Sequence, residues 1–102
     1  MLSQQTSQTL QTLREAVNAR RTSSFSYRDL AGQQSQRVVR PLGCFFWGRV
    51  WTLAAWCESR QDFRNFRVDR IETLELMPET FRDESNKSFA QFLRQANQRL
   101  KN

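Results

Sequence analysis

The spacing of apolar residues changes along this chain, from a helical period near each end to strand-like runs between them. Between residues 8 and 20, apolar residues recur every three or four positions from Leu10 to Val17, which predicts a short amphipathic helix. The same period returns between residues 87 and 100, where phenylalanine and leucine share one stripe and predict a second helix. Residues 1–9 are polar, and we expect them to form a flexible N-terminal tail.

Between the two predicted helices, runs of Val, Ile, Phe and Trp are broken by Gly, Pro and Asp, a pattern typical of short strands. Because no helical segment separates the runs, we expect an antiparallel sheet of five short strands that curls into a small barrel. The fold class is therefore expected to be mainly β, with one helix before the barrel and one after it. The runs cover residues 23–29, 37–42, 44–57 (a hairpin), 62–71 and 72–77.

The run that contains both cysteines has the features of a β-hairpin with its turn at Gly48 and Arg49. In that register Cys44 faces Leu53, and Cys57 lies beyond the paired positions. A disulfide between the two cysteines would need a slipped hairpin. We therefore expect two free, buried thiols.

The apolar run Val50–Trp56 follows the hairpin turn, and we expect it to be the central strand, covered on both faces. Trp51 and Leu53 share one strand face, which favours a place in the core for both of them and for Phe46 on the paired strand. One aromatic residue on the opposite face of the hairpin is a candidate stacking surface. That face carries Phe45, Trp47 and Trp56.

The composition limits what such a barrel can do. At 102 residues the chain holds one domain, and 16 Lys+Arg against 10 Asp+Glu give a formal net charge of +6. Fourteen of these cations are arginine, which favours bidentate contacts with phosphate or carboxylate.

The chain has no histidine and no metal-ligand spacing, so we expect no enzyme activity, metal or cofactor. No apolar run is long enough to span a membrane, and we expect a soluble, cytoplasmic protein.

Arginines gather in the middle of the chain, where residues 37–70 hold seven arginines and three acidic residues. The segment 71–86 reverses this balance, with five acidic residues and one arginine. A basic surface beside an acidic segment favours an anionic ligand or a neighbouring subunit bound head to tail. Strand alternation sends Arg67 to one face and Arg64 with Arg70 to the other, unless a bulge intervenes. The alternative is that each arginine pairs with a nearby carboxylate as ordinary surface. The candidate ligand-binding residues are Arg37, Arg40, Arg64, Arg67 and Arg70.

Several spaced motifs stand in order in the middle of the chain. They are Arg37-Val-Val-Arg40-Pro41-Leu42-Gly43, Arg49-Val-Trp51-Thr52-Leu53, Arg64-Asn-Phe66-Arg67-Val-Asp69-Arg70-Ile71 and the closing Phe81. Together they resemble the motifs of the WYL domain family. One position departs from the family pattern, because Thr52 stands where the family has Tyr. This change removes a ring that would be able to pack or stack at that point.

The resemblance implies an Sm-like, SH3-like barrel that acts as the ligand-sensing domain of a bacterial transcriptional regulator. Its arginine-rich face would bind nucleic acid or a nucleotide, and Trp47, Trp51 and Thr52 are the candidate stacking or pocket residues. A winged helix-turn-helix normally precedes the domain in this family, so we expect a DNA-binding domain elsewhere in a longer chain. The alternative is a standalone domain. Residues 10–82 are expected to form the WYL-like domain, and residues 83–102 a linker and an amphipathic helix.

A second hypothesis, from a different functional class, is a dimerisation or protein-interaction module with no nucleic-acid ligand. In that case the arginines form ion pairs between the subunits of a homodimer. This hypothesis predicts a concentration-dependent dimer without affinity for oligonucleotides, whereas the sensing hypothesis predicts binding that weakens steeply with salt. Light scattering with and without an oligonucleotide separates the two.

Overall fold

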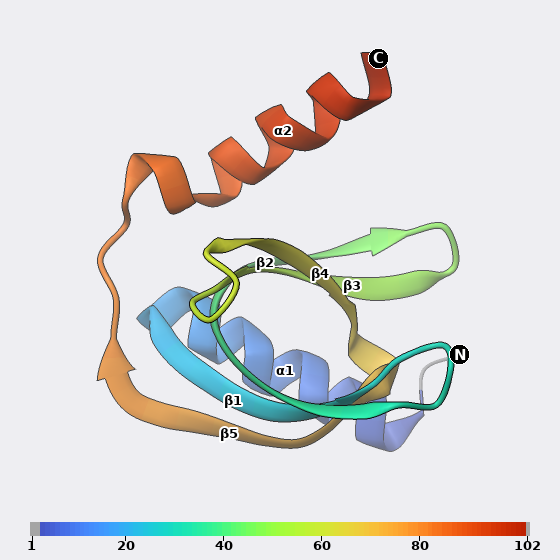
Figure 1. Cartoon of the computed structure of the whole chain (residues 1–102). Helices are drawn as coiled ribbons and strands as arrows, with labels where there is room; N and C mark the ends of the chain where they lie inside the picture. The colour runs from blue at the N-terminus through green and yellow to red at the C-terminus, as the bar shows by residue number, and fades with distance from the viewer. Residues whose placement is uncertain (1–2, 102) are drawn as a thin grey trace.

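The computed structural model describes residues 3–101 of the chain, and their side chains as far as residue 97. As the sequence predicted, five antiparallel strands form one sheet, with one α-helix before the strands and one after them (Figure 1). The elements are α1 (Gln4–Ala19), β1 (Arg21–Arg28), β2 (Gln34–Trp47), β3 (Val50–Cys57), β4 (Asp62–Arg67), the 3₁₀ turn η1 (Val68–Arg70), β5 (Ile71–Thr80), the 3₁₀ turn η2 (Ser85–Lys87) and α2 (Phe89–Lys101).

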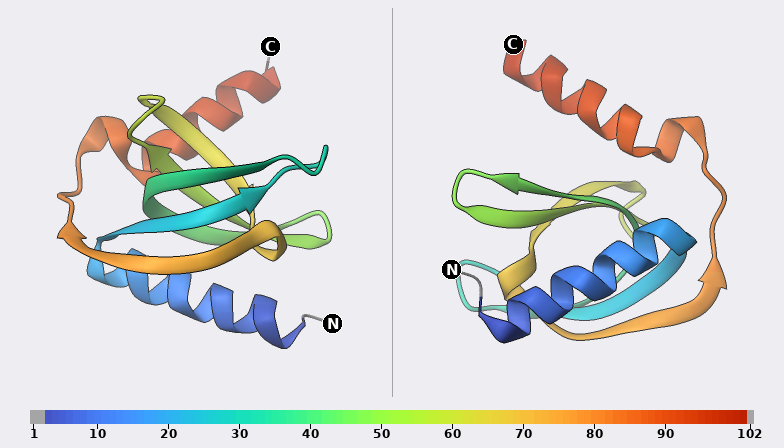
Figure 2. Two further views of the ribbon diagram at one scale, coloured as in Figure 1. Left: turned by 60° about the horizontal axis from the view of Figure 1, so that its bottom comes forward. Right: turned by 180° about the vertical axis from the view of Figure 1, so that it is seen from behind.

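The sheet curls into a small barrel, and the two helices lie on different sides of it (Figure 2). The strand order is β4-β3-β2-β1-β5, so β2 is the middle strand and β4 and β5 are the edges. The prediction that β3 is the central strand was wrong, because β3 lies beside the middle strand. The expected burial of β3 on both faces is confirmed, since its residues from Thr52 to Cys57 are all buried.

Apolar side chains form one cluster inside the barrel and a smaller one outside it. Residues from every strand fill the interior, and α1 covers it with Leu10 and Leu13. The outer cluster lies between the sheet and α2, where the rings of Phe63 and Phe92 meet edge to face with their centroids 5.9 Å apart. The second helix is therefore packed on the outside of the barrel and not on its interior.

The helix α1 begins at Gln4, four residues before its predicted start at residue 8, so part of the expected flexible tail forms its first turns. Ser3 is the N-cap residue, and its hydroxyl accepts a hydrogen bond from the Thr6 N–H at 3.1 Å. These first turns carry no apolar stripe, which is why the hydrophobic period did not reveal them. The helix ends at Ala19, and the C-cap residue Arg20 has a φ of 52°, in the left-handed region.

The strand β2 joins two runs that the sequence pattern suggested were separate. The chain passes through Pro41 with a bulge and not a turn: Pro41 lies opposite Ala55, and Gly43 lies opposite Ala54. Pro41 has no N–H to donate to the ladder, and a bulge is one of the places in a sheet that tolerates proline. Gly43 has a separate role, since a Cβ at this position would lie 3.3 Å from the Phe89 ring of α2.

The hairpin formed by β2 and β3 has the predicted register, with Phe46 opposite Trp51. Gly48 lies in the turn with a φ of 65°, a conformation that glycine adopts without strain. Phe46, which alternation placed in the core, is instead 57% exposed. The reason is that β4 pairs with β3 only from Thr52 onward, so the tip of the hairpin extends past the third strand.

The two cysteines are free thiols, as predicted. Cys44 lies opposite Leu53 in the ladder, as predicted. The prediction that Cys57 lies beyond the paired positions was wrong, because β2 continues back through Pro41 and places Val39 opposite Cys57. Cys57 is buried, whereas Cys44 is half-buried and not fully enclosed as expected. Burial raises the pKa of the Cys44 thiol to about 11, which keeps it protonated at neutral pH.

The strand β4 ends at Arg67, although the sequence pattern suggested that it continues. The chain makes the 3₁₀ turn Val68–Arg70 and enters β5 at Ile71. The backbone N–H of Arg67 donates to the hydroxyl of Tyr27 on β1 at 3.0 Å. Because Arg70 lies in the 3₁₀ turn and not in a strand, the alternation of strand side chains does not determine the direction of its side chain.

The strand β5 pairs with β1 alone and forms an edge of the sheet. It continues through Pro78 to Thr80, beyond the predicted run, which ended at residue 77. An edge strand tolerates proline because the missing N–H is not needed for a second partner strand. The pairing with β1 is interrupted by bulges, and there Arg21 Nε donates to the Met77 carbonyl at 2.9 Å.

Candidate ligand-binding cleft

A cleft of about 900 Å³ lies between α2 and the outer face of the sheet at β3 and β4. Its floor is largely aromatic, with Phe45 from β2, Phe63 from β4 and Phe92 from α2. Thr52 of β3 also lines the floor and is 8% exposed. A concave apolar site of this size is typical of proteins that bind small ligands.

Three of the five predicted arginines line this cleft together. Arg64 and Arg67 lie on β4, and Arg70 lies on the turn η1 that follows it. Alternation along a continuous strand would have separated these three side chains. The end of β4 at Arg67 and the change of direction in η1 bring Arg70 to the same cleft. We call these three residues the arginine wall.

Two members of the arginine wall are paired with carboxylates. Arg67 makes a bidentate contact with Asp69, with its Nε and Nη2 at 3.1 and 2.7 Å from the two carboxylate oxygens. This hydrogen bonding lowers the pKa of Asp69 and raises the pKa of Arg67. Arg64 lies 3.6 Å from Asp62, which is an ion pair without a hydrogen bond.

Arg70 differs from its two neighbours in the arginine wall. Its Nη1 donates to the backbone carbonyl of Asp29 at 3.0 Å, so the bond positions the guanidinium without neutralising it. Among the described residues, Arg70 has no carboxylate within ion-pair distance, and its Nε has no hydrogen-bond partner. An orphaned donor on a charged group is costly. Arg70 is thus the member of the arginine wall whose positive charge is not paired with a carboxylate among the described residues.

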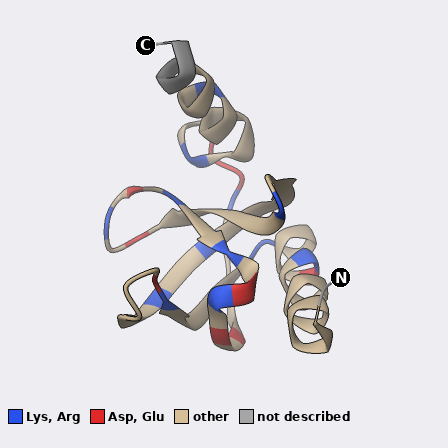
Figure 3. Ribbon diagram, turned by 90° about the vertical axis from the view of Figure 1, so that its right-hand side faces the viewer, with Lys and Arg blue, Asp and Glu red and all other residues tan. Residues whose placement is uncertain are grey.

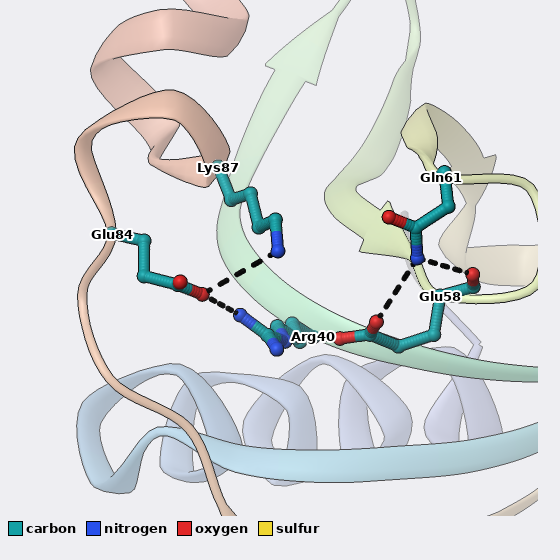
Figure 4. Close-up of polar contacts among 5 residues, drawn as sticks. All are labelled: Arg40, Glu58, Gln61, Glu84 and Lys87. Carbon is teal, nitrogen blue, oxygen red and sulfur yellow. Dashed lines mark hydrogen bonds and ion pairs between the residues drawn. The ribbon is translucent and has the colours of Figure 1, made fainter.

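The other two predicted arginines lie away from the cleft. Arg40 is placed between Glu58, in the turn after β3, and Glu84, in the segment before α2, and contacts both (Figure 4). Arg37 donates from Nε to the Ser35 hydroxyl at 3.1 Å, and its guanidinium lies 5.7 Å from the Phe66 ring centroid. The structure thus divides the single arginine surface suggested by the sequence.

The two tryptophans proposed as stacking residues also have different surroundings. Trp47 lines the cleft and is 70% exposed, so most of this side chain is accessible to a ligand. Trp51 packs against the inner core and lies between the Phe46 ring at 5.6 Å and the Arg14 guanidinium at 5.2 Å. Of the three candidate pocket residues, Trp47 and Thr52 lie at the cleft and Trp51 does not.

Sequence reasoning did not find several residues of the cleft. Phe63 and Phe92 were expected only as apolar positions of a strand and a helix. Leu93, one of the leucines of the predicted helical stripe, is 50% exposed at the cleft. The apolar stripe of α2 includes more residues than those that pack on the sheet. The width of this stripe was the signal in the sequence that some of its residues line a cleft instead.

The charges around the arginine wall are mixed. On the side that Figure 3 shows, basic and acidic segments lie next to one another on the barrel.

Within residues 3–101, no helix is long and apolar enough to cross a membrane. In the same described part of the chain, no group of three or more His, Cys, Asp or Glu residues is placed to hold a metal ion.

Comparisons with known proteins agree with the fold and with the resemblance. The family described as WYL domain matches residues 8–76, which is more than half of the chain. The uncharacterized HTH-type transcriptional regulator YobV of Bacillus subtilis (strain 168) is 34% identical over 74 residues, which are 69% of this chain and 24% of that protein. Among solved structures, the proteasome accessory factor B/C (PafBC) of Arthrobacter aurescens is similar with a TM-score of 0.74 and 25% identity, over 85% of this chain and 14% of that chain. The chain therefore spans about a quarter of the curated relative.

Proposed function

The chain belongs to the WYL domain family, and we propose that it is the ligand-sensing domain of a cytoplasmic bacterial transcriptional regulator. The name of YobV describes an HTH-type regulator, and the present chain covers 24% of that protein. We therefore place the DNA-binding domain in another part of a longer chain. The role of the domain described here is to bind a ligand and not to catalyse a reaction.

The proposed ligand is a nucleotide or a short piece of single-stranded nucleic acid held in the cleft. The observation that carries this proposal is that Arg64, Arg67 and Arg70 form one wall of a cleft whose floor is largely aromatic. Guanidinium groups bind phosphate oxygens, and exposed rings such as Trp47 stack on bases. The two kinds of group are close enough here to serve one ligand.

The ion pairs that Arg64 and Arg67 make with carboxylates limit how many phosphates of a ligand the cleft can bind. Arg64 and Arg67 already have carboxylate partners, so the cleft offers one unmatched positive charge and two that need to exchange partners. This arrangement suits a ligand with one to three phosphates better than a long strand. For a single-stranded ligand that contacts three phosphates, log K is expected to fall with log salt with a slope of about −2.

Binding to a labelled oligothymidylate of about four nucleotides, which carries about three internucleotide phosphates, tests the proposal. Arg70→Gln is expected to weaken binding about tenfold, because it removes a charged contact worth about 1.4 kcal/mol. Arg37→Gln is the matched control, since it removes the same charge outside the cleft and is expected to leave affinity unchanged. Equal affinity of wild type and Arg70→Gln, or an equal loss in both variants, would exclude the cleft as the binding site.

A second candidate is the dimerisation module, which the exposed aromatic residues at the hairpin tip favour. Phe46 is 57% exposed and Trp47 is 70% exposed, and aromatic residues of this kind are enriched in protein interfaces. This alternative predicts a dimer that dissociates on dilution and is weakened by Phe46→Ser. Light scattering over a range of concentrations, with and without the oligonucleotide, distinguishes it from the sensing role.

A further inference from the structure

The N-terminal end of α2 is fastened to the barrel by close packing. The Phe89 ring lies against β2 at Gly43, where even a Cβ would come within 3.3 Å of it. The same ring stacks on Phe92, with centroids 6.0 Å apart and an interplanar angle of 10°. Ser88 caps the helix by accepting a hydrogen bond from the Gln91 N–H at 3.1 Å.

An ion cluster fastens the segment that leads into α2. Arg40 of β2 contacts both Glu84, in this segment, and Glu58, in the turn between β3 and β4 (Figure 4). Lys87 lies 3.7 Å from the Glu84 carboxylate, and its ammonium lies 5.4 Å from the Trp56 ring centroid. The guanidinium of Arg40 thus joins the segment before α2 to β2 and to the turn between β3 and β4.

Beyond Phe92 the helix has few contacts with the sheet. Leu93 is 50% exposed, and Ala96 and Asn97 line the cleft without packing in either apolar cluster. Figures 1 and 2 show the C-terminal half of α2 rising away from the strands. The cleft is therefore open on one side, and its width depends on the angle of a helix that is held at one end.

We propose that α2 is a hinged wall of the cleft, which pivots at the Gly43–Phe89 contact and closes onto the arginine wall when a ligand fills the space. Closure would bury Leu93 and Ala96, so the apolar area removed from water favours the closed position. The ion cluster at Arg40 holds the pivot in place while the distal half of the helix moves. Closure therefore converts occupancy of the cleft into a displacement of the end of α2.

This inference rests on the proposed function for the identity of the ligand, but the hinge itself can be measured without one. Spin labels at Arg94→Cys on α2 and Asn18→Cys on α1 report the angle of the helix, in a background with Cys44→Ala and Cys57→Ala. Both labelled positions are exposed and lie outside the cleft. A second pair, Asn18→Cys with Glu75→Cys on β5, is the control because it reports the barrel alone.

Without ligand, we expect a broad distance distribution for the Arg94 pair and a narrow one for the control pair. Gly43→Ala, which pushes the Phe89 ring, is expected to shift the Arg94 pair and leave the control pair unchanged. Adding the oligothymidylate is expected to narrow and shorten the Arg94 distribution. Phe89→Leu provides a second variant that alters the pivot without adding a Cβ to the strand.

The outcomes separate the two proposals. A narrow Arg94 distribution that neither pivot variant changes would show a fixed wall and overturn the hinge. Binding of the oligonucleotide with no change in this distribution would also overturn the hinge, but it would leave the sensing function standing. The third outcome is that the Arg94 distance distribution shifts in Gly43→Ala while the wild-type protein does not bind the oligonucleotide. This outcome would support the hinge and refute the proposed ligand.

Discussion

The hydroxyl of Tyr27 accepts a hydrogen bond from the backbone N–H of Arg67 at 3.0 Å, although the two residues lie 40 positions apart in the sequence. This bond joins β1 to the end of β4, an edge strand of the sheet. The Tyr27 ring also meets Phe66 edge to face, with centroids 5.0 Å apart. Tyr27 therefore fixes the place where the chain leaves β4 and turns toward Arg70.

Tyr27→Phe is expected to lower the free energy of unfolding by about 1 kcal/mol, because it keeps the ring and removes one partly buried hydrogen bond. Chemical denaturation measures this loss, and the m-value is expected to stay constant because the packing is unchanged. The same variant is expected to weaken binding to the cleft, since the position of Arg67 is no longer fixed. A stability equal to that of wild type would show that solvent replaces the Tyr27 hydroxyl without cost.

The Arg67–Asp69 pair predicts a specific pH response. Hydrogen bonds from Arg67 lower the Asp69 pKa from the ordinary value of 3.8, so the folded chain binds this proton less readily than the unfolded chain. The pair therefore contributes stability above pH 3.8, and this contribution is lost as the pH falls through the lower folded value. A carbon-13 titration of the Asp69 carboxyl measures the shift.

In Arg67→Gln, the Asp69 titration is expected to return to the ordinary range. The matched control is Arg64→Gln, because Arg64 pairs with Asp62 at 3.6 Å and makes no hydrogen bond to Asp69. An Asp69 titration that is the same in wild type and Arg67→Gln would assign the lowered pKa to another cause.

Thr52→Tyr is expected to place a ring in the floor of the cleft and to reduce oligonucleotide affinity about tenfold or more, by occupying the ligand's space. Thr52 lies opposite Phe45 and Arg67 in the ladders, so a larger side chain at this position points between them. Thr52→Val is the control, since it keeps the volume and removes only the hydroxyl. Tighter binding by Thr52→Tyr would indicate that a ring at this position stacks on the ligand.

Phe92→Ala is expected to release α2 from the sheet. Phe92 is 8% exposed and packs against Phe63, Phe45 and Phe89, so the substitution removes the centre of the outer cluster. The expected cost is about 3 kcal/mol, the low end for a buried phenylalanine, because α2 packs on the sheet with one face. Hydrogen exchange is expected to rise in α2 and not in β1, which lies in the inner core.

The matched variant for this experiment is Leu93→Ala, which truncates a neighbouring residue that is 50% exposed. It is expected to leave both stability and exchange close to wild type. Equal effects of the two substitutions would contradict the assignment of Phe92 as the anchor and Leu93 as part of the open cleft.

Local signals were sufficient to predict much of the fold. The two-residue turn at Gly48 determined the register of the hairpin, and the register in turn placed Cys44 opposite Leu53. The number of strands and the positions of both helices also followed from the change of hydrophobic period. These features depend on residues that are close together in the sequence.

Features that depend on distant contacts were not predicted. The passage of β2 through Pro41 requires β3 as a partner, and the exposure of Phe46 follows from where β4 stops pairing. The candidate site was limited in the same way, because alternation placed Arg64 and Arg70 apart from Arg67 and could not anticipate η1. The residue types of the arginine wall were visible in the sequence, but their shared location was not.

The unpaired edge of β5 bears on whether copies of this domain aggregate through their sheets. A sheet edge offers unused backbone groups to any extended segment that approaches it, and aggregation often begins there. Here Pro78 supplies no donor at this edge, the exposed Glu75 and Glu79 repel strands of like charge, and bulges interrupt the regular spacing. The barrel is therefore expected to withstand high local concentration, as when identical copies are tethered side by side, without merging into a shared sheet.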